Sequence, residues 1–441
     1  MKSSCLALLS ICLAQLPSAL GSPGPGSLVE AQEPQWHRHN TKYGHRCVVP
    51  ANDDGTDDSP AIIEAFKKCR KNSVIVFKNT TYNIEKAIAV KDLHNVNVDI
   101  KGTLLWSKDI QYWLANSLPI GPGVDQESYP PAAYQNQTTA MILGGKRLWV
   151  EGHGYGTFDG NGQTWYDFIR GESNYPNRPH ALVVTAEDSY FHGLRFVQPQ
   201  MWTVTIVGSK KVLLEDIYVN ATSSNRNPAR NTDGANTMFS DRITFRRWTI
   251  QNGDDCIAAK ANSTNILIED SVFHEGQGVA IGSIGQYFDR FETVENVTAR
   301  NIVAHGSRYI GRIKTWTGEQ NDWPPNGGGG GIGYVKNISW DNITVHDGER
   351  APLVINQCYT NVQLANCSTS TFDISDISYT NIRGTIRSGN MAEFQCSRSH
   401  GGCDDISMAG IDLQNIAVDP PVASTRYRCS NVNAPEGFTC N

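Results

Sequence analysis

Short runs of alternating apolar and polar residues recur along most of the chain, each with the pattern of a half-buried β-strand. Their apolar positions can be aligned, and the equivalent residues are Val212, Ile243, Ile266, Val297, Ile338 and Ile377. The spacings between these residues are 31, 23, 31, 41 and 39, and Tyr190 lies 22 residues before Val212. A base unit of about 23 residues that carries variable insertions is typical of a solenoid.

The segments between these runs contain no amphipathic helix of ten or more residues, which excludes leucine-rich and helical repeats. Strands rich in Val, Ile and Thr instead predict an all-β fold, a right-handed parallel β-helix. One helix is expected at 57–69, where Pro60 stands near the start and Ile62, Ile63 and Phe66 form an apolar stripe. Such a helix suits an N-terminal cap, because an open end of the solenoid would expose core and strand edges.

The first 21 residues have the organisation of a secretory signal peptide. Lys2 is followed by an apolar stretch over 6–16 and a small-residue exit that ends at Gly21. The Pro- and Gly-rich residues that follow predict an unpacked leader over 22–45, and we expect a single β-helix domain over 46–441. No later stretch approaches 18 consecutive apolar residues, so the mature protein is expected to be soluble and extracellular.

Charge narrows the range of partners. The formal net charge is −6 and the sequence contains no basic run, which argues against nucleic acid or an anionic membrane. We expect no cofactor, and a monomer is the default for a capped solenoid. Eight Asn-X-Ser/Thr sequons predict N-glycosylation at Asn79, Asn136, Asn220, Asn262, Asn296, Asn337, Asn342 and Asn366.

Eleven cysteines are present, and Cys5 and Cys12 fall within the predicted signal peptide, which leaves an odd number, nine. Most cysteines of an exported chain should pair, although sequence alone does not fix the pairing. The spacing favours four local bridges, Cys47–Cys69, Cys358–Cys367, Cys396–Cys403 and Cys429–Cys440. Cys256 is left over, and we expect it to be buried.

Three acidic residues fall into the register of the repeat. A residue one coil later in a parallel β-helix lies about 4.8 Å from its predecessor. Asp233 precedes Asp254 by 21 residues and Asp255 by 22, so the three carboxylates are expected on adjacent rungs. Two coils further on, Arg312 and Lys314 are alternate residues that share one strand face.

Converging carboxylates raise one another's proton affinity, so one can hold a proton while another is ionised and activates water. Glycoside hydrolysis requires that combination, and the facing cations would suit an acidic sugar. A lone Asp in such a fold is most often a turn residue, but three in register opposite two cations favour chemistry. A calcium site is the other interpretation, which Arg312 and Lys314 oppose because they would compete with a divalent cation.

Four ordered motifs resemble the polygalacturonase family of pectin hydrolases, glycoside hydrolase family 28, and the likeness covers nearly all of the chain after residue 45. They are NTDG at 231–234, GDD at 253–255, GQG at 276–278 and RIK at 312–314. The resemblance implies an inverting mechanism with Asp254 as general acid and with Asp233 and Asp255 positioning the water. It also assigns sugar binding to Arg312, Lys314 and Tyr359.

The sequence departs from the family pattern twice. Gln277, on the coil between the acids and the cations, stands where polygalacturonases have a histidine, and glutamine cannot titrate. We place Gln277 among the substrate-binding residues, and expect His274, three residues earlier, to face elsewhere. Phe273 stands where many relatives have a cysteine that pairs with the one after GDD, which would explain why Cys256 is left over.

Two long irregular insertions, 116–138 and 316–333, favour the fungal exo-acting branch, because walls at one end of a cleft leave a pocket for a chain terminus. Trp316 and Trp323 are candidates for sugar stacking, and the five glycines at 327–331 are interpreted as slack. The prediction is a secreted exo-hydrolase that releases terminal galacturonate from pectic chains. Gln277 favours the alternative, release of terminal L-rhamnose, and a non-catalytic pectin-binding protein is a third possibility.

Overall fold

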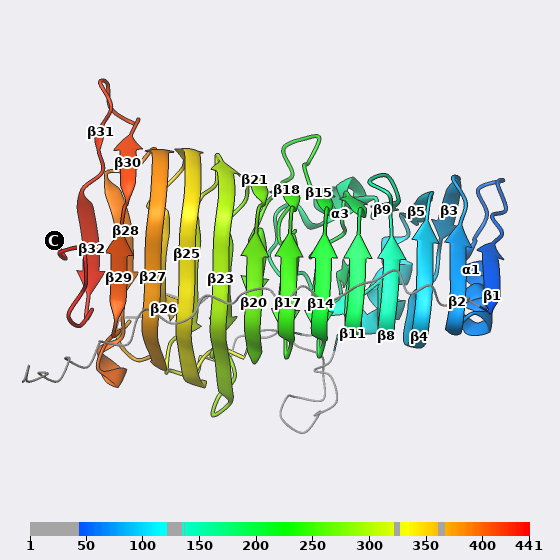
Figure 1. Ribbon diagram of the computed structural model, residues 1–441, viewed down its shortest axis with the longest axis horizontal. Helices are drawn as coiled ribbons and strands as arrows, with labels where there is room; N and C mark the ends of the chain where they lie inside the picture. Colours follow the sequence, from blue (N-terminus) through cyan, green and yellow to red (C-terminus); the bar gives the residue numbers. More distant parts are fainter. Residues whose placement is uncertain (1–43, 121–134, 136, 322–326, 360–366) are drawn as a thin grey trace, which may run out of the picture.

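The computed structural model describes residues 44–120, 135, 137–321, 327–359 and 367–441, and it is a parallel β-helix (Figure 1). The predicted signal peptide and nearly all of the predicted leader lie outside the described residues. Successive coils stack along one axis, and the strands of neighbouring coils pair in parallel. Among the described residues, no helix is long and apolar enough to cross a membrane.

Each complete coil contributes to three faces. The first face consists of β1 (His45–Val49), β2 (Lys71–Phe77), β4 (Ile88–Ile100), β8 (Met141–Glu151), β11 (Leu182–His192), β14 (Lys210–Glu215), β17 (Asp241–Arg246), β20 (Ser263–Glu269), β23 (Phe291–His305), β25 (Ile332–Gly348), β27 (Thr371–Ile386) and β29 (Ile406–Ala409). The second face begins with the first residues of β4, β8 and β11 and continues with β13 (Val204–Val207), β16 (Ala235–Met238), β19 (Ile257–Ala259), β22 (Val279–Ile284), β24 (Gly311–Trp316), β26 (Leu353–Tyr359), β28 (Asn390–Gln395) and β32 (Arg426–Ser430).

The third face is built from short strands and from the last residues of β23, β25 and β27. Its separate strands are β3 (Thr81–Ile84), β5 (Thr103–Trp106), β9 (Thr157–Asp159), β12 (Arg195–Val197), β15 (Tyr218–Asn220), β18 (Thr249–Asn252), β21 (Val272–Glu275) and β30 (Asp412–Asn415). The short β31 (Val422–Ala423) pairs with β30 in antiparallel orientation.

The predicted repeat register is confirmed, because the six aligned residues from Val212 to Ile377 pair in sequence order on the first face. The backward extension of the alignment is wrong by one residue, since Val212 pairs with Ser189 and Tyr190 pairs with Leu213. Ser189 is a buried serine whose hydroxyl donates to the Glu187 carbonyl and accepts from the Leu148 amide. A hydrogen-bonded serine therefore occupies an interior position where the pattern predicted an apolar side chain.

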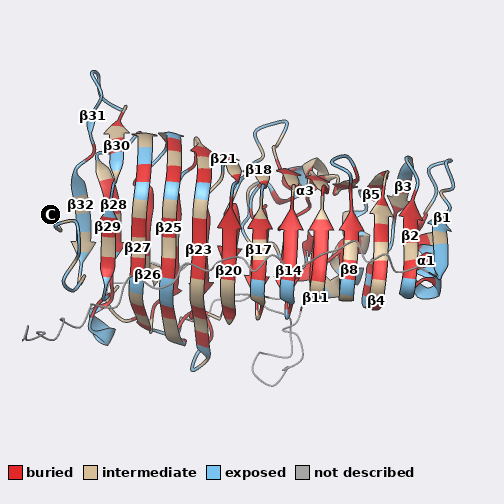
Figure 2. Ribbon diagram, in the orientation of Figure 1, coloured by how far each residue is buried: buried red, intermediate tan, exposed pale blue. Residues whose placement is uncertain are grey.

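The interior of the coil is one continuous apolar core, and buried residues recur at matching heights along β23, β25 and β27 (Figure 2). Aromatic rings stack in it from rung to rung. Trp340 and Tyr379 are 4.8 Å apart at an interplanar angle of 11°, and Tyr379 and Phe394 are 5.8 Å apart at 16°. Because each coil buries the face of the next, stability is shared between neighbours.

The predicted cap is helix α1 (Ser59–Lys68), which packs on β1, β3 and β4 at the N-terminal end of the solenoid. Pro60 lies in its first turn, and Ile62 and Phe66 are buried as expected. Ile63, the third member of the predicted stripe, is instead 41% exposed. The buried face consists of Ser59, Ile62, Ala65 and Phe66, which recur at helical spacing, and Ile63 falls beside it.

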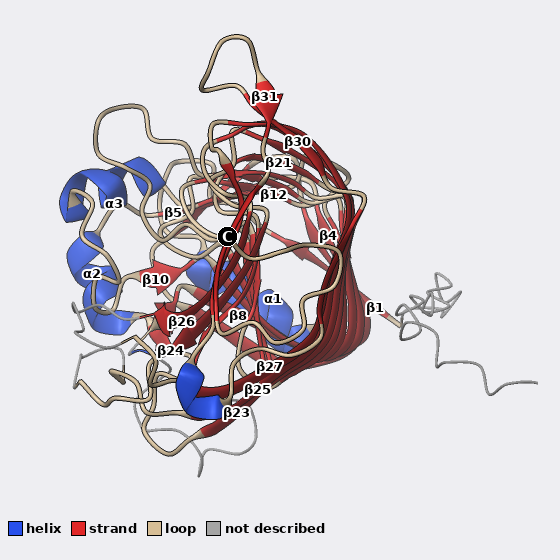
Figure 3. Ribbon diagram, turned by 90° about the vertical axis from the view of Figure 1, so that its left-hand side faces the viewer, coloured by secondary structure: helices blue, strands red, loops and turns tan. Residues whose placement is uncertain are grey.

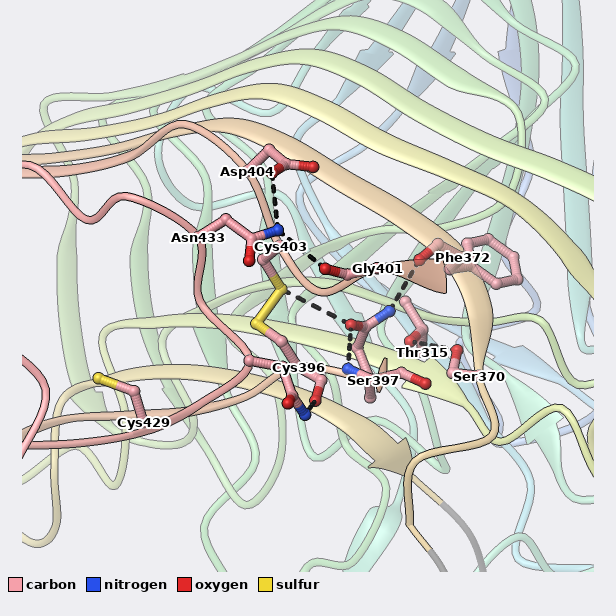
Figure 4. The surroundings of a disulfide bond; sticks show 12 residues. Thr315, Ser370, Phe372, Cys396, Ser397, Gly401, Cys403, Asp404, Cys429 and Asn433 are labelled. Atoms are coloured by element: carbon pink, nitrogen blue, oxygen red, sulfur yellow. Dashed lines mark hydrogen bonds between the residues drawn. A yellow bond between two sulfur atoms is a disulfide. The ribbon is translucent and has the colours of Figure 1, made fainter. Parts of the chain in front are cut away.

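All four expected disulfides are present, and Cys256 is a free, buried cysteine. Around the Cys396–Cys403 bridge (Figure 4), the buried Gln357 accepts from the Ser397 amide at 2.7 Å and donates to the Phe372 carbonyl at 2.9 Å. The bridge therefore supports the end of β26, two residues before Tyr359, near the C-terminal end of the solenoid.

Extra elements cover the N-terminal part of the second face. They are α2 (Ile110–Asn116), α3 (Gly162–Ile169) and a small sheet of β6 (Leu118–Pro119), β7 (Thr138–Thr139) and β10 (Pro179–His180). The view along the solenoid axis (Figure 3) places α2, α3 and β10 on the side of the coil that carries β24 and β26. A second apolar cluster lies here, outside the coil, and includes Ile120, Ile142, Trp202, Met238 and Tyr287.

Both predicted insertions form hydrogen bonds with the loop that follows β22. Much of the first insertion and residues 322–326 of the second lie outside the described residues. The Gln135 amide donates to the Tyr287 hydroxyl at 2.9 Å, and the Gln135 side chain donates to Gln286 at 2.7 Å. Gly329 donates to the Gln286 carbonyl at 2.9 Å, and Gly331 to that of Gly285 at 3.0 Å.

The interpretation of the five glycines as slack is wrong. A Cβ on Gly327 would lie 2.1 Å from the Gln286 carbonyl oxygen, and Gly329 and Gly330 have φ values of +110° and +82°. Glycine is therefore needed there for close packing and for left-handed backbone.

The predicted sequons occupy different environments. The side-chain amides of Asn296, Asn337 and Asn342 donate to asparagines on the preceding rung. Asn79 is exposed in the turn between β2 and β3. Asn136 and Asn366 lie outside the described residues.

Candidate active site

The solenoid brings the three predicted acids together at the edge of the second face. Asp233 lies just before β16, while Asp254 and Asp255 lie just before β19 on the next rung. Carboxylate oxygens of the three residues lie within 4.8 Å of one another. Asp233 and Asp255 are buried, and Asp254 is partly exposed. The predicted convergence is therefore present in the structure.

Backbone contacts hold the two acidic turns against each other. The Gly234 amide donates to the Asp255 carbonyl at 3.0 Å. The buried side-chain amide of Asn252 donates to the Thr232 carbonyl at 3.0 Å and to the Asp255 carbonyl at 2.8 Å. A Cβ on Gly253 would lie 2.2 Å from the Ala229 carbonyl oxygen, which explains the glycine before the acidic pair.

Gln277 connects an acid to a cation. Its side-chain amide donates to Asp254 Oδ1 at 3.2 Å, and its oxygen accepts from Arg312 at 2.9 Å. The other Asp254 oxygen accepts from the Asn231 side chain at 3.2 Å. The glycines beside Gln277 are required, because a Cβ on Gly276 (φ +63°) would lie 2.3 Å from Asn252 Oδ1. His274, by contrast, stacks on His305 away from the acids, as expected.

Asp255 and Lys314 form a buried ion pair with 2.5 Å between Lys314 Nζ and Asp255 Oδ2. Burial acts to raise the pKa of Asp255, but the charges of Lys314, Lys260 and Arg312 outweigh burial and hold this pKa below its usual value. The second oxygen of Asp255, Oδ1, is buried and accepts no hydrogen bond from any described residue. Asp255 is thus the ionised member of the triad, with one oxygen available.

The other two acids are shifted in the opposite direction. Burial, followed by the charges of Asp254 and Asp255, raises the pKa of Asp233 well above its usual value. Burial and the charge of Asp255 likewise raise the pKa of Asp254. The site therefore combines one acid with a lowered pKa and two acids that hold their protons more tightly than an exposed aspartate does.

Sequence reasoning missed a group of residues on the N-terminal side of the acids. Lys260 is buried, its ammonium lies 4.6 Å from the ring centre of Trp202, and it donates to the Gly282 carbonyl at 3.2 Å. The buried His180 ring packs 4.6 Å from Trp202. Its Nε2 and both polar atoms of the Asn236 side chain are buried without a hydrogen-bond partner among the described residues. A lysine directly after the apolar strand Ile257–Ala259 was the available signal.

Tyr359 lies on the C-terminal side of the site. The Arg312 guanidinium is 5.7 Å from its ring centre and Lys314 Nζ is 5.8 Å from it, while Tyr309 lies 4.6 Å from Arg312 on the other side. Trp316 is 2% exposed and meets Tyr359 edge to face at 5.6 Å. The expectation that Trp316 stacks on sugar is therefore wrong, because the ring is buried beneath Tyr359. Trp323 lies outside the described residues.

The acidic triad has donor atoms close enough together for a cation, but its surroundings oppose one. Lys314 occupies one oxygen of Asp255, and the charges of Lys260 and Arg312 also act on that carboxylate. A divalent ion would have to displace or face three positive charges.

Comparison with known proteins agrees with the geometry. Residues 114–440 match the family described as Glycosyl hydrolases family 28. The chain is 45% identical to "Alpha-L-rhamnosidase rgxB" of Aspergillus niger over 89% of each chain. It is 35% identical to "Exopolygalacturonase" of Cochliobolus carbonum over 87% of this chain and 83% of that one. The fold is similar to that of the endo-xylogalacturonan hydrolase from Aspergillus tubingensis, with a TM-score of 0.74, 23% identity and coverage of 90% and 98%.

Proposed function

Because the chain belongs to glycosyl hydrolases family 28, we propose that it is a secreted exo-acting enzyme that removes the terminal α-1,4-linked galacturonate from polygalacturonate and oligogalacturonates. The observation that supports this proposal is the charge of the site. Lys260, Arg312 and Lys314 face three acids, two of which have raised pKa values. Raised pKa values reduce the negative charge of the acids relative to the cations that face them, which favours an anionic sugar.

The proposed reaction uses the two neighbouring acids differently. Asp254, with its raised pKa and partial exposure, donates a proton to the glycosidic oxygen of the leaving group. Asp255, with its lowered pKa, takes a proton from water through its unpartnered Oδ1, assisted by Asp233. Arg312, Lys314 and Tyr359 contact the sugar, and Gln277 orients Asp254 and Arg312 relative to each other.

Inversion at the anomeric carbon is proposed from the family resemblance. One carboxylate oxygen of each acid lies within 4.8 Å of those of the other two, whereas the carboxyl groups of inverting enzymes are usually roughly 6.5–9.5 Å apart. They are close because two of the acids are adjacent in sequence and the third is on the neighbouring rung. Nuclear magnetic resonance of the first product anomer tests this point, since a retained anomer would exclude inversion.

A second candidate is release of terminal L-rhamnose from rhamnogalacturonan. It is favoured by the 45% identity to a protein named alpha-L-rhamnosidase and by Gln277 in place of the family histidine. In this case the galacturonate on the other side of the cleaved bond would meet Arg312 and Lys314. The cations are therefore compatible with both sugars.

Product analysis on three substrates tests the proposal: oligogalacturonate, rhamnogalacturonan fragments and an aryl α-L-rhamnoside. We expect monomeric galacturonate from the first, with release reduced about 10²- to 10⁴-fold in Asp254→Asn because proton donation to the leaving group is lost. The matched control is Asp241→Asn, an aspartate on the first face. Rhamnose alone would establish the second candidate, and binding without release from any substrate would make the protein a non-catalytic pectin binder.

A further inference from the structure

A hollow on the N-terminal coils gathers positive charge at a distance from the acidic triad. Its charged lining consists of Arg70, Lys71, Lys91, Lys146 and Lys210 together with Asp92 and Glu187. We call this set the basic hollow. Five cations against two acids give an excess of +3 in a protein whose formal net charge is −6. The feature therefore opposes the charge of the molecule as a whole.

The solenoid register aligns part of this charge along the molecular axis. On five successive rungs the paired residues are Lys71, His94, Lys146, Glu187 and Lys210. A lysine thus recurs on every second rung, a backbone spacing of about 9.6 Å. β2 and β14 begin with the first and last of these lysines, at the lower ends of the strand arrows in Figure 1.

Small residues keep the hollow open. Its floor includes Gly145, Thr185, Ala186 and Gly208. A Cβ on Gly145 (φ +142°) would lie 2.0 Å from the Leu93 carbonyl oxygen, so no larger residue fits there. The register of β4 against β8 shifts between Val90 and Leu93, and this bulge places the exposed Lys91 and Asp92 at the rim.

Three of the five cations are not neutralised. Arg70 is 3.4 Å from Asp92 and Lys146 is 2.7 Å from Glu187. Lys71, Lys91 and Lys210 are exposed and form no ion pair with any described residue. Burial and then the charges of Arg147, Lys71 and Lys146 lower the pKa of His94, which agrees with a positive potential in the hollow.

The basic hollow is separate from the acidic site. The two regions lie at opposite ends of β13. Just before this strand, the Thr203 amide donates to the Asp233 carbonyl at 2.8 Å. Directly after the strand comes Gly208, which lines the hollow. The two sites therefore lie at opposite ends of the strands of the second face.

We propose that the basic hollow binds a run of galacturonate residues in an unesterified pectic chain, outside the pocket where hydrolysis occurs. A linear polyanion can contact positive charges distributed along the axis, and Lys71, Lys91 and Lys210 form no ion pair with any described residue. Individual exposed ion pairs are weak, but several along one polymer raise the effective concentration of chain ends near the acids. The identity of this ligand rests on the proposed function, whereas the charge of the hollow does not.

The test uses the full chain with Asp254→Asn, which prevents hydrolysis during the measurement. Lys71, Lys91 and Lys210 are replaced together by glutamine, and the matched control replaces the exposed Lys78, Lys108 and Lys336 in the same way. Binding to unesterified polygalacturonate is measured by affinity electrophoresis. We expect about tenfold weaker binding for the hollow variant and little change for the control, because three exposed ion pairs are lost only in the former.

Fully methyl-esterified polygalacturonan and a salt series complete the experiment. We expect no binding of the neutral polymer and a steep loss of binding to the acidic one as salt rises. In the active background, the hollow variant should have a raised KM on polygalacturonate and an unchanged kcat/KM on a disaccharide. Equal affinity of the two triple variants, binding of the neutral polymer, or no binding by the Asp254→Asn parent overturns the proposal. Failure of the proposed function would be seen separately, as no galacturonate released from oligogalacturonate by the wild-type chain.

Discussion

The Asp255–Lys314 ion pair determines how protons are distributed over the acidic triad. Both groups are buried, and their mutual attraction lowers the pKa of Asp255 and raises that of Lys314. The charge retained on Asp255 then contributes to the raised pKa values of Asp233 and Asp254. Lys314, together with Lys260 and Arg312, thus separates the roles of acids that have the same chemical structure.

We predict a bell-shaped dependence of kcat/KM on pH with an optimum at acidic pH. Activity falls at low pH as Asp255 gains a proton and at higher pH as Asp254 loses one. In Lys314→Met the cation that lowers the pKa of Asp255 is gone, so the acidic limb should move to higher pH. Kinetics between pH 3 and pH 8 would measure the shift, and Lys336→Met, on the exposed part of β25, is the control. An acidic limb that does not move would contradict the assignment of Asp255 as the ionised group.

At the scale of elements, stacked rungs turn single side chains into rows. His192 on β11 lies between carboxylates on the neighbouring rungs, 2.9 Å from Glu151 and 3.0 Å from Asp216. His305 on β23 instead lies between two other imidazoles, 5.1 Å from His274 and 4.8 Å from His346. The same residue type therefore has opposite electrostatic surroundings on two faces of the solenoid, because His192 lies on the first face and His305 on the third.

These two histidines are expected to affect stability in opposite directions as pH changes. Burial lowers the pKa of His192, but Glu151 and Asp216 outweigh burial and raise it. The stability that protonated His192 contributes to the folded protein is fully present below the pKa of the unfolded chain, about 6.5. This stability is lost as pH rises through the folded pKa. Burial and then the charges of His274 and His346 lower the pKa of His305. The folded protein therefore loses stability as pH falls and His305 is forced to take up a proton.

Melting temperatures of His192→Gln and His305→Gln at pH 5 and pH 8.5 test this pair. The loss of Tm relative to wild type should be larger at pH 5 than at pH 8.5 for His192→Gln. For His305→Gln it should be smaller at pH 5, because the wild type then carries a charge beside two histidines. Each variant serves as the control for the other, and the same pH trend in both would refute the argument.

At the scale of the whole molecule, segments far apart in the sequence close one side of the second face. The contact of Gln135 with Gln286 and Tyr287 spans about 150 residues of chain and lies against the apolar cluster that contains Trp202. Trp202 in turn contacts Lys260, whose charge acts on Asp233 and Asp255. We call these contacts, from Gln135 through Gln286 and Tyr287 to Trp202, the wall of the second face. The wall is the structural reason for proposing attack at a chain end.

Removing part of the wall should change the products. We expect Tyr287→Ala to release oligosaccharides longer than one residue, because it removes both the ring that packs in the apolar cluster and the hydroxyl that accepts from the Gln135 amide. Tyr287→Phe keeps the ring and removes only the hydroxyl, so it should still release monomers. Chromatography of early products distinguishes the two variants. Monomers as the sole product of a folded Tyr287→Ala would show that this wall does not limit attack to chain ends.

Much of the fold could be predicted because the repeat leaves a direct trace in the sequence. Alternating strands at Val212, Ile243 and Ile266 must bury one face, and the next coil is the surface available for it. The one-residue error at Tyr190 arose because a buried serine was not recognised as an interior residue. The acids and the facing cations of the site could be predicted for the same reason, since the coil length alone indicates which side chains become neighbours.

His180 and Trp202 could not be assigned in this way, whereas Lys260 directly follows a regular strand and was overlooked. His180 and Trp202 come from loops and short strands outside the regular rungs, where the repeat gives no register. Trp316 was assigned to the surface because sequence does not reveal that Tyr359 covers it. The five glycines were interpreted as slack because their tight contacts are with a loop about 40 residues away.

The sequence by itself determined the solenoid, its cap and the convergence of the acids, since each depends on local patterns or on a repeat length that fixes neighbours. The cysteine spacing favoured the four disulfides without fixing their pairing. Only the tertiary structure decided which acid is ionised, because that depends on burial and on the distance from Asp255 to Lys314. It also revealed the basic hollow in a chain without a basic run. Lysines 64 to 75 residues apart in the sequence come to lie two rungs apart only when the backbone has coiled.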